Sequence, residues 1–337
     1  MSIAPIHLAA LMAFGYTEEE ARFLYFVATH SGYFVARQFL AFTGAHWGKR
    51  TTLFWMKLHT NEHARTEHFP KSGVVYHLFA RRLYRQIGRE NIRNRREHEI
   101  AFIQRRIAIL DYVLANQNQN YLETEPDKLA YFRDREIPSH VLPSKTYHGQ
   151  PASQPTVRYF VDKFPMFLEA HGSPSPVATF SYVQGAEAHL TEFVRHVETY
   201  LPLFRALPES GFLYLARTDS HFSKARELFH SLVTIPLESN PADDLLRYFS
   251  IRKAWDLRQY ACVSDADLIF RNQAKARFAA ERFEHLYRAW KVGRVTEAEI
   301  RAELGGQPVP HTVHFRAEVL RPFAGNRVEA EERRCRK

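Results

Sequence analysis

Residues 46–79 read HWGKRTTLFWMKLHTNEHARTEHFPKSGVVYHLF, and this stretch decides the fold predicted for the N-terminal part of the chain. Residues 47–59 are typical of a short helix, with Leu53 and Met56 available to face a core. Residues 64–69 and 74–79 are typical of β-strands, and Pro70-Lys-Ser-Gly73 supplies a four-residue hairpin connection between them. The stretch therefore predicts a helix followed by a β-hairpin.

Two further helices are predicted before this stretch. Thr17-Glu-Glu-Glu20 is a capping box, and the helix that it opens continues to about His30, where Ser31-Gly32 breaks it. A second helix, residues 35–42, ends at Thr43-Gly44, because glycine readily adopts the backbone conformation that ends many helices. Three short helices followed by a β-hairpin predict a winged helix-turn-helix.

The positive charge of the chain is concentrated in one segment. The 337 residues carry a formal net charge of +9. Residues 46–106 hold fourteen Lys and Arg against five Asp and Glu, so this segment contains the whole excess and the remaining residues balance. Such a concentration favours a polyanionic partner, of which nucleic acid is the commonest.

The predicted third helix supplies the candidate groove-facing residues. The N-terminal residues of a recognition helix lie nearest the base edges, and phosphate contacts come from flanking basic residues. We expect the arginines after the hairpin to contact phosphate, and Phe54 or Trp55 to cover the core or support a dimer contact instead of lying in a groove. The candidate DNA-binding residues are Lys49, Arg50, Thr51, Thr52, Lys57, Arg65, Lys71, Arg81, Arg82, Arg85 and Arg89.

The remainder of the chain predicts a mixed architecture. An amphipathic helix over residues 97–114 places its apolar stripe inward and Arg105 and Arg106 largely away from it. Strands over residues 157–168, 177–183 and 211–217 alternate with helices over 187–207 and 220–232, which describes a small α/β unit. The predicted fold is α+β: a winged-helix domain with its basic helix (15–115), a connecting segment (116–155), a nuclease-like α/β domain (156–235), a helical region (243–305) and a flexible tail (306–337).

Two parts of the sequence resemble the replication-relaxation family, which is found on bacterial plasmids and other mobile elements. The resemblance rests on the winged-helix order, on Tyr76-His-Leu-Phe, and on the basic helix Arg82-Leu-Tyr-Arg-Gln-Ile-Gly followed by His98-Glu-Ile-Ala-Phe-Ile. Residues 156–232 resemble the C-terminal half of that family, which is similar to restriction-endonuclease cores. The resemblance implies a DNA-binding role in replication, mobilisation or transcription control of a mobile element.

The nuclease activity that such a core suggests can be tested on the residues. The fold normally presents an Asp and then an acid-x-Lys pair, because carboxylates hold Mg²⁺ and the lysine steers the attacking water. Asp162 fits the first acid, but Tyr182 and Gln184 occupy the expected acidic positions and no lysine follows. A neutral pair cannot hold a divalent ion, so we expect no activity. A divergent Mg²⁺ nuclease using Asp162, Glu187 and a rearranged third ligand stays the enzymatic alternative.

Other function classes are disfavoured by composition. The sequence shows neither an apolar run long enough for a membrane span nor a signal peptide, and two distant cysteines suit a reducing cytoplasm. His59-Thr-Asn-Glu-His63 fits an inverted zinc-peptidase motif, but it lies at a helix-to-strand junction, so we expect no metal or other cofactor there. We expect a cytoplasmic protein whose partner is double-stranded DNA, with a homodimer or another protein of the element as a further partner. The third hypothesis is a protein-interaction module that uses the winged helix.

Overall fold

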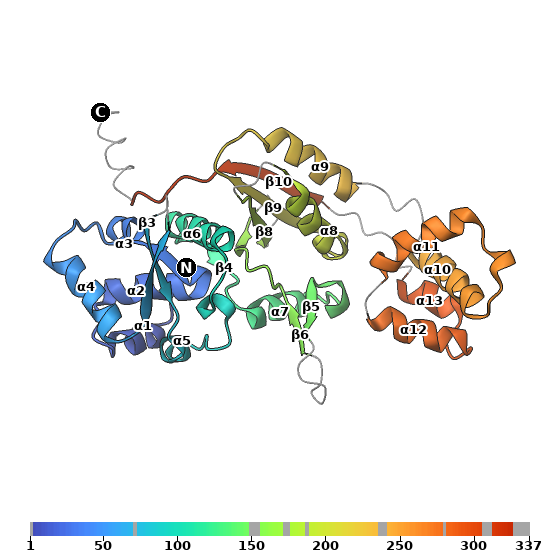
Figure 1. Cartoon of the computed structure of the whole chain (residues 1–337), viewed down its shortest axis with the longest axis horizontal. Helices are drawn as coiled ribbons and strands as arrows, with labels where there is room; N and C mark the ends of the chain where they lie inside the picture. Colours follow the sequence, from blue (N-terminus) through green and yellow to red (C-terminus); the bar gives the residue numbers. More distant parts are fainter. Residues whose placement is uncertain are drawn as a thin grey trace. The chain divides into compact units, whose positions relative to one another are not determined.

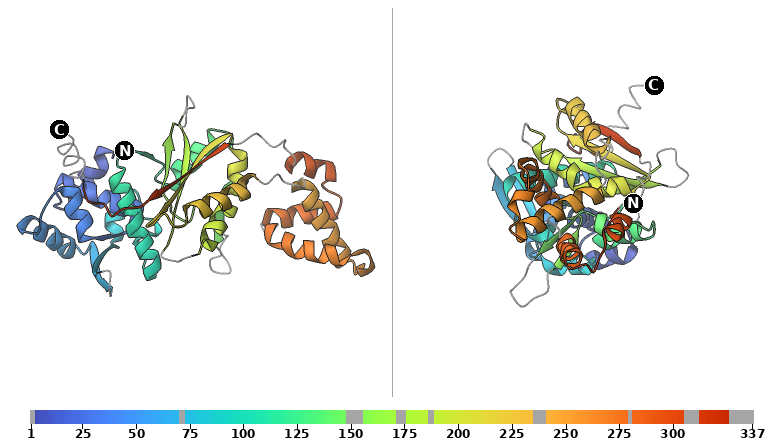
Figure 2. Two further views of the ribbon diagram at one scale, coloured as in Figure 1. Left: turned by 90° about the horizontal axis from the view of Figure 1, so that it is seen from above. Right: turned by 90° about the vertical axis from the view of Figure 1, so that its right-hand side faces the viewer.

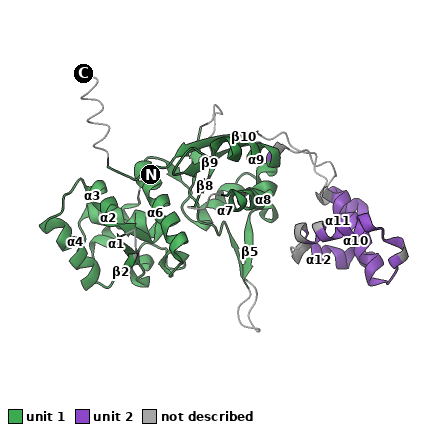
Figure 3. Ribbon diagram, turned by 45° about the horizontal axis from the view of Figure 1, so that its top comes forward, with its two compact units in different colours: residues 1–232, 311–337 green, residues 233–310 purple. Residues whose placement is uncertain are grey.

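The computed structural model describes residues 3–69, 73–147, 156–170, 176–185, 189–234, 241–278, 281–304 and 312–325. The fold is mixed α+β, as the sequence predicts. The chain forms two compact units, one made of residues 1–232 together with 311–337 and one of residues 233–310 (Figure 3). Both predicted DNA-binding and α/β parts belong to the first unit.

The first part of unit 1 begins with helices that their own sequences cap. In the capping box, the backbone N–H of Glu20 donates to Thr17 Oγ1 at 3.3 Å, and the N–H of Thr17 donates to Glu20 Oε2 at 2.8 Å. After a π-helical turn the chain reverses at Gly32, whose φ is 84° and whose Cα faces the Asn94 carbonyl too closely for a side chain. The elements are α1 (Pro5–Met12), α2 (Glu18–Phe26), β1 (Tyr33–Val35), α3 (Ala36–Thr43), α4 (Lys49–Thr60), β2 (Ala64–Phe69) and β3 (Gly73–Leu78).

These three strands form an antiparallel sheet in the order β1-β3-β2. The predicted hairpin is confirmed, with its tip, residues 70–72 and Lys71 among them, outside the described residues. The helices pack through aromatic side chains: Phe39 and Phe54 stack with ring centres 3.9 Å apart, and Phe23 meets both edge-on. The short strand β1 was not predicted, since its three residues carry no periodic signal.

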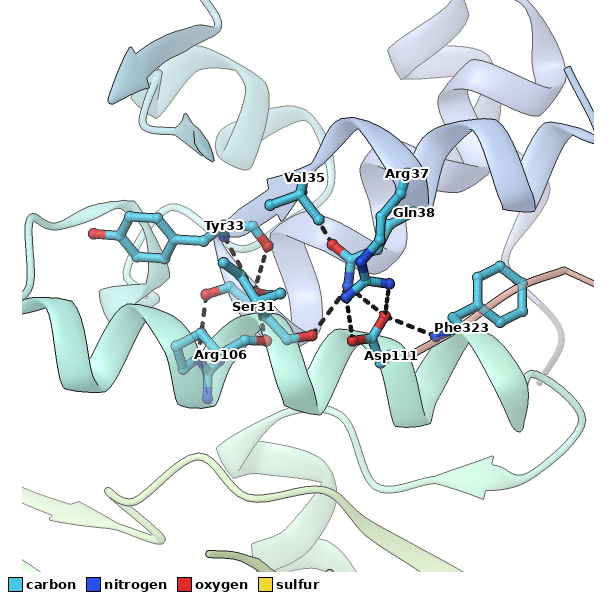
Figure 4. A network of polar contacts seen from close by, with 9 residues as sticks. Ser31, Tyr33, Val35, Arg37, Gln38, Arg106, Asp111 and Phe323 are labelled. Carbon is cyan, nitrogen blue, oxygen red and sulfur yellow. Dashed lines mark hydrogen bonds and ion pairs between the residues drawn. The ribbon is translucent and has the colours of Figure 1, made fainter. Parts of the chain in front are cut away.

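A helical segment follows the hairpin and contains an unexpected buried arginine. Its elements are α5 (Arg81–Gln86), a 3₁₀ turn (Arg93–Arg95) and α6 (Ile100–Ala115). Arg106 was predicted to lie away from the core, which is wrong, because it is 1% exposed. Its guanidinium donates to the Ser31 carbonyl at 3.2 Å (Figure 4). It also donates to the Lys163 carbonyl at 3.0 Å and to Asn94 Oδ1 at 2.9 Å. These bonds join the N-terminal helices to the turn that contains Lys163.

The predicted connecting segment 116–155 is in part regular structure, so that prediction was wrong in part. It contains β4 (Asn120–Tyr121), α7 (Glu125–Arg133), a 3₁₀ turn (Ser139–Val141) and β5 (Ser144–Tyr147); residues 148–155 lie outside the described part. The predicted strand 157–168 is also wrong as a single element. It is two strands, β6 (Thr156–Tyr159) and β7 (Met166–Glu169), separated by a turn with positive φ at Phe160 and Lys163.

The larger sheet of unit 1 has the order β10-β9-β8-β7-β4 (Figure 1). Its remaining elements are β8 (Val177–Val183), α8 (Thr191–Ala206), β9 (Glu209–Ala216), α9 (Phe222–Thr234) and β10 (Thr312–Val319). Strands β8, β9 and β10 are parallel, and β4, β7 and β8 are antiparallel. Phe212 of β9 contacts Phe204 of α8 and Phe229 of α9, whereas Tyr112 of α6 contacts Phe167 of β7 on the opposite face.

Strand β10 corrects the prediction of a flexible tail from residue 306. Residues 312–319 pair with all of β9, and Leu320 and Phe323 are buried. The Phe323 N–H donates to Asp111 Oδ1 at 3.1 Å, and Asp111 also accepts from both terminal nitrogens of Arg37 at 2.7 Å (Figure 4). The chain therefore returns to the N-terminal helices, and residues 326–337 lie outside the described part.

Unit 2 is helical, which confirms the prediction for residues 243–305. In the sequence it follows α9 and precedes β10 (Figure 2). A cluster that includes Leu245, Phe249, Tyr287 and Ile300 forms its core. Its elements are α10 (Pro241–Asp256), a 3₁₀ turn (Tyr260–Cys262), α11 (Asp265–Arg277), α12 (Glu281–Lys291) and α13 (Glu297–Leu304). Across both units, no helix in the described ranges is long and apolar enough to cross a membrane.

Candidate nucleic-acid interface

Helix α4 presents a different face from the one predicted. Phe54 and Leu58 face the core, whereas Leu53 and Met56 are 44% and 57% exposed, so the inward assignment of the latter two was wrong. Thr51 is fully buried, and its hydroxyl donates to the Gly48 carbonyl and accepts from the Gly48 N–H. Thr51 therefore caps the helix and cannot contact a base. The exposed residues of the first turns are Lys49, Arg50, Thr52 and Leu53.

Two basic residues of α4 are bound by acids of α2. Lys57 Nζ lies 2.7 Å from Glu20 Oε2, and the Glu20 side chain is nearly fully buried, so the charge of Lys57 is offset by a buried carboxylate. Arg50 pairs with Glu19, and its side chain stays 56% exposed. Arg50 therefore stays available at the surface, but only in competition with a carboxylate.

The hairpin contributes less basic surface than predicted. Arg65 on β2 contacts Glu97, lies 3.5 Å from Glu67 and meets His77 Nδ1 at 3.2 Å. Two carboxylates therefore offset the charge of Arg65, and its assignment to phosphate stays a prediction. Lys71 lies outside the described residues.

Helix α5 carries the clearest basic surface. Arg81, Arg82 and Arg85 are exposed, and Arg82 donates to the Asn61 carbonyl at the C-terminal end of α4. Arg81 and Arg85 share a helix face, since they are four residues apart. Arg89 differs: it lies 2.5 Å from Glu123, with both side chains mostly buried, so its charge is already offset within the protein.

Tertiary ion pairs explain why the local charge count overstates the basic surface. The acids that bind Arg50, Lys57, Arg89 and Arg105 lie outside residues 46–106, as Glu19, Glu20, Glu123 and Glu192. Among the described residues, no carboxylate lies within 4.0 Å of seven further cations of the segment, whose side chains are exposed or half-buried. Those cations are Lys49, Arg81, Arg82, Arg85, Arg93, Arg95 and Arg96.

The surface around α4 is also apolar. Trp47, Leu53 and Met56 are exposed, whereas Trp55 is half-buried and stacks on Tyr76 with ring centres 4.4 Å apart. Trp55 and Phe54 thus both support the core, as predicted for at least one of them. The exposed face of α4 therefore combines Lys49 and Arg50 with Leu53 and Met56, and the exposed Trp47 lies two residues before the helix.

The Asp162 expected on a catalytic strand lies in the turn between β6 and β7. Its Oδ2 accepts from the Tyr200 hydroxyl at 2.8 Å and lies 3.2 Å from His196 Nδ1. Burial raises the pKa of Asp162, but the hydrogen bond and charge of His196 and the charge of Lys128 outweigh burial and hold the pKa below its usual value. Asp162 is therefore an ionised, internally bonded carboxylate.

The two strand positions at which a nuclease core would carry further acids hold no carboxylate. Tyr182 is buried, and Gln184 Nε2 donates to the His189 carbonyl while its Oε1 accepts from Tyr214. Glu187 lies outside the described residues. Within the part of the chain that the structure describes, no three His, Cys, Asp or Glu side chains are grouped to hold a metal ion. At the zinc-like motif, His63 is buried against the Tyr16 hydroxyl, at 2.9 Å, and His59 is exposed.

Comparison with known proteins adds no relative. No protein-family model, curated protein or solved structure matches the chain. Sequence inspection missed that Arg93 and Arg96 meet Arg158 and Lys163 at one pocket, and about 60 intervening residues left no local signal of this.

Proposed function

We propose that this protein binds double-stranded DNA through an N-terminal winged helix, in which α4 faces the major groove and α5 contacts phosphate. The order α2, β1, α3, α4, β2, β3 with a β1-β3-β2 sheet supports this proposal, because a recognition helix followed by a hairpin is the arrangement of such domains. The hairpin then flanks α4.

One observation carries the proposal: α5 holds three exposed arginines, Arg81, Arg82 and Arg85, with no described carboxylate within ion-pair distance. Guanidinium groups that are not neutralised within the protein attract phosphate, to which they donate through a planar fork. The bond from Arg82 to Asn61 keeps α5 beside the end of α4. Phosphate contacts there would position α4 on the duplex, and Lys49 and Arg50 would contact base edges.

We further propose that the protein is not an enzyme. Its proposed role is in the bacterial cytoplasm, in replication, mobilisation or transcription control of a mobile element. The biological role rests on the resemblance to the replication-relaxation family. The bonding of Asp162 to His196 and Tyr200 supports the proposal that the α/β part has no nuclease activity.

Fluorescence anisotropy with a labelled duplex tests the proposal. A site selected from a random duplex pool should bind more tightly than its scrambled version. The double variant Lys49→Ala, Arg50→Ala should bind the selected site at least tenfold more weakly. Its affinities for the selected and the scrambled duplex should also differ less than those of the wild type. A matched variant, Arg217→Ala with Lys224→Ala, removes the same charge from exposed positions around α9 and should bind like the wild type. Absence of duplex binding at low salt would contradict the proposal.

A protein-interaction role for the same surface is the second candidate. Trp47, Leu53 and Met56 favour it, because exposed apolar side chains on one short segment mark interaction sites more often than DNA-contacting ones. The partner would be a second copy of the chain or another protein of the element. Trp47→Ser with Met56→Ser would then reduce self-association in sedimentation velocity, and duplex binding would be absent.

A further inference from the structure

A pocket of about 160 Å³ lies between the segment that follows α5, the β5–β6 hairpin and the turn after β6. Four cationic side chains line it, and Glu125 is its one acidic lining residue among the described residues. The cations come from three separate segments of unit 1: Arg93 and Arg96, Arg158, and Lys163.

Glu125 does not neutralise this group of cations. One carboxylate oxygen accepts from Arg158 Nε at 2.8 Å and the other accepts from the Tyr159 N–H at 2.9 Å. Arg93, Arg96 and Lys163 have no described carboxylate within ion-pair distance. The pocket therefore holds an excess of three positive charges.

Tyr147 accounts for two of the donors that a ligand would meet in this pocket. The guanidinium of Arg93 lies over the ring of Tyr147, with 4.1 Å between the guanidinium carbon and the ring centre. A guanidinium stacked in this way keeps the edges of its N–H groups free for an anion. The Tyr147 hydroxyl is itself buried without a hydrogen-bond partner in the described structure.

The pKa of Lys163 is lowered by its burial and by the positive charges around it. Burial and the charges of Lys128, Arg106 and Arg158 lower its pKa to about 8. The hydrogen bond from Arg106 Nη1 to the Lys163 carbonyl, at 3.0 Å, fixes the backbone of this residue, whose φ is 64°. An anion that enters the pocket would reduce the repulsion between Lys163 and the neighbouring cations and so favour the protonated form of Lys163.

We propose that this pocket binds a phosphate group, held by Arg93, Arg96 and Lys163 with the Tyr147 hydroxyl as a further donor. The phosphate comes from a free nucleotide or from a DNA backbone. The proposal stands on the pocket itself and does not require that α4 or α5 bind a duplex.

Calorimetric titration with inorganic pyrophosphate tests the site. At pH 8, binding should be accompanied by proton uptake, measured in two buffers of different ionisation enthalpy, because the anion raises the pKa of Lys163. Lys163→Met with Arg96→Gln should weaken binding by at least tenfold and abolish the proton uptake. Arg96→Gln alone, at an exposed position, should weaken binding without affecting the fold, which circular dichroism checks.

A matched control removes one lysine and one arginine elsewhere. Lys224→Met with Arg217→Gln, whose residues do not line the pocket, should bind pyrophosphate like the wild type. Equal affinity in the pocket and control variants, or no binding by the wild type at millimolar pyrophosphate, would overturn the proposal.

Two further titrations distinguish the source of the phosphate. A deoxynucleoside triphosphate that binds more tightly than pyrophosphate, and loses affinity in the pocket variant, identifies a nucleotide site. A random duplex whose affinity falls in the pocket variant identifies a backbone contact. An Arg81→Gln, Arg85→Gln variant that loses duplex binding but retains pyrophosphate binding separates this site from the proposed function.

Discussion

Arg50 on α4 and Glu19 on α2 form an ion pair at the surface that we propose to face DNA. The guanidinium of Arg50 is more than half exposed, so the pair is a surface contact of small stability. Its consequence concerns binding: a duplex that recruits Arg50 has to displace Glu19, whose carboxylate also repels phosphate.

Removal of this acid should strengthen duplex binding. We expect Glu19→Gln to raise the affinity by about three- to tenfold, since it frees one arginine and removes one negative charge. Fluorescence anisotropy at fixed salt measures the change. Glu18→Gln is the matched control, because Glu18 is exposed and has the same charge. An equal effect of the two substitutions would show that Arg50 is not recruited.

The buried pair of Arg89 and Glu123 should matter for stability. We expect Arg89→Gln to lower the free energy of unfolding by about 3 kcal/mol, because it leaves a mostly buried carboxylate without its partner. Urea denaturation measures the loss. Arg85→Gln, an exposed position of α5, should change stability by less than about 0.5 kcal/mol. Similar stability of the two variants would contradict the structural role given to Arg89.

Three buried histidines should make stability depend on pH. Burial lowers the pKa of His30 to about 3 and the pKa values of His63 and His77 to about 4. Below about pH 6.5 the unfolded chain takes up protons that the folded chain refuses, so stability should fall as the pH falls from 6.5 to 4. Each histidine contributes a slope of about 1.4 kcal/mol per pH unit in that range.

Urea denaturation between pH 7 and pH 4.5 checks this dependence. His77→Phe keeps a ring stacked on Tyr33. It should reduce the slope of the unfolding free energy against pH by about 1.4 kcal/mol per pH unit, the contribution of one proton. Constant stability across the range would contradict the buried neutral state of these side chains.

We expect no cleavage of single-stranded or supercoiled DNA with Mg²⁺ or Mn²⁺. Asp162 is bonded to His196 and Tyr200, and Tyr182 and Gln184 supply no second carboxylate. Agarose-gel assays over several hours provide the measurement. Metal-dependent nicking that disappears in Asp162→Asn would establish the enzymatic alternative.

Local signals in the sequence predicted much of the fold. The capping box at Thr17, the hairpin around residues 70–73 and strand 177–183 depend on neighbouring residues, and the structure confirms them. The turn that separates β6 from β7 has positive φ values at Phe160 and Lys163. Neither residue is a glycine, so the sequence did not indicate a turn there. Strand β10 follows a separate helical unit, and its pairing with β9 spans about a hundred residues.

The candidate site was predictable only in part, because long-range charge pairing decides it. The segment 46–106 contains the basic excess, but Glu19, Glu20 and Glu123 reach it from elsewhere in the chain. The burial of Arg106 likewise depends on the carbonyls of distant turns. Lys49 and Arg50 of α4 and the exposed arginines of α5 are the predicted residues on which the proposed function depends.

Our claim that α5 contacts the phosphate backbone is tested by the salt dependence of duplex binding. Each lost phosphate contact lowers the slope of log K against log salt by about one unit, equally on every sequence. Arg81→Gln with Arg85→Gln should therefore flatten the slope by about two units on both a selected and a scrambled duplex. A variant that keeps the wild-type slope on both duplexes would contradict the claim.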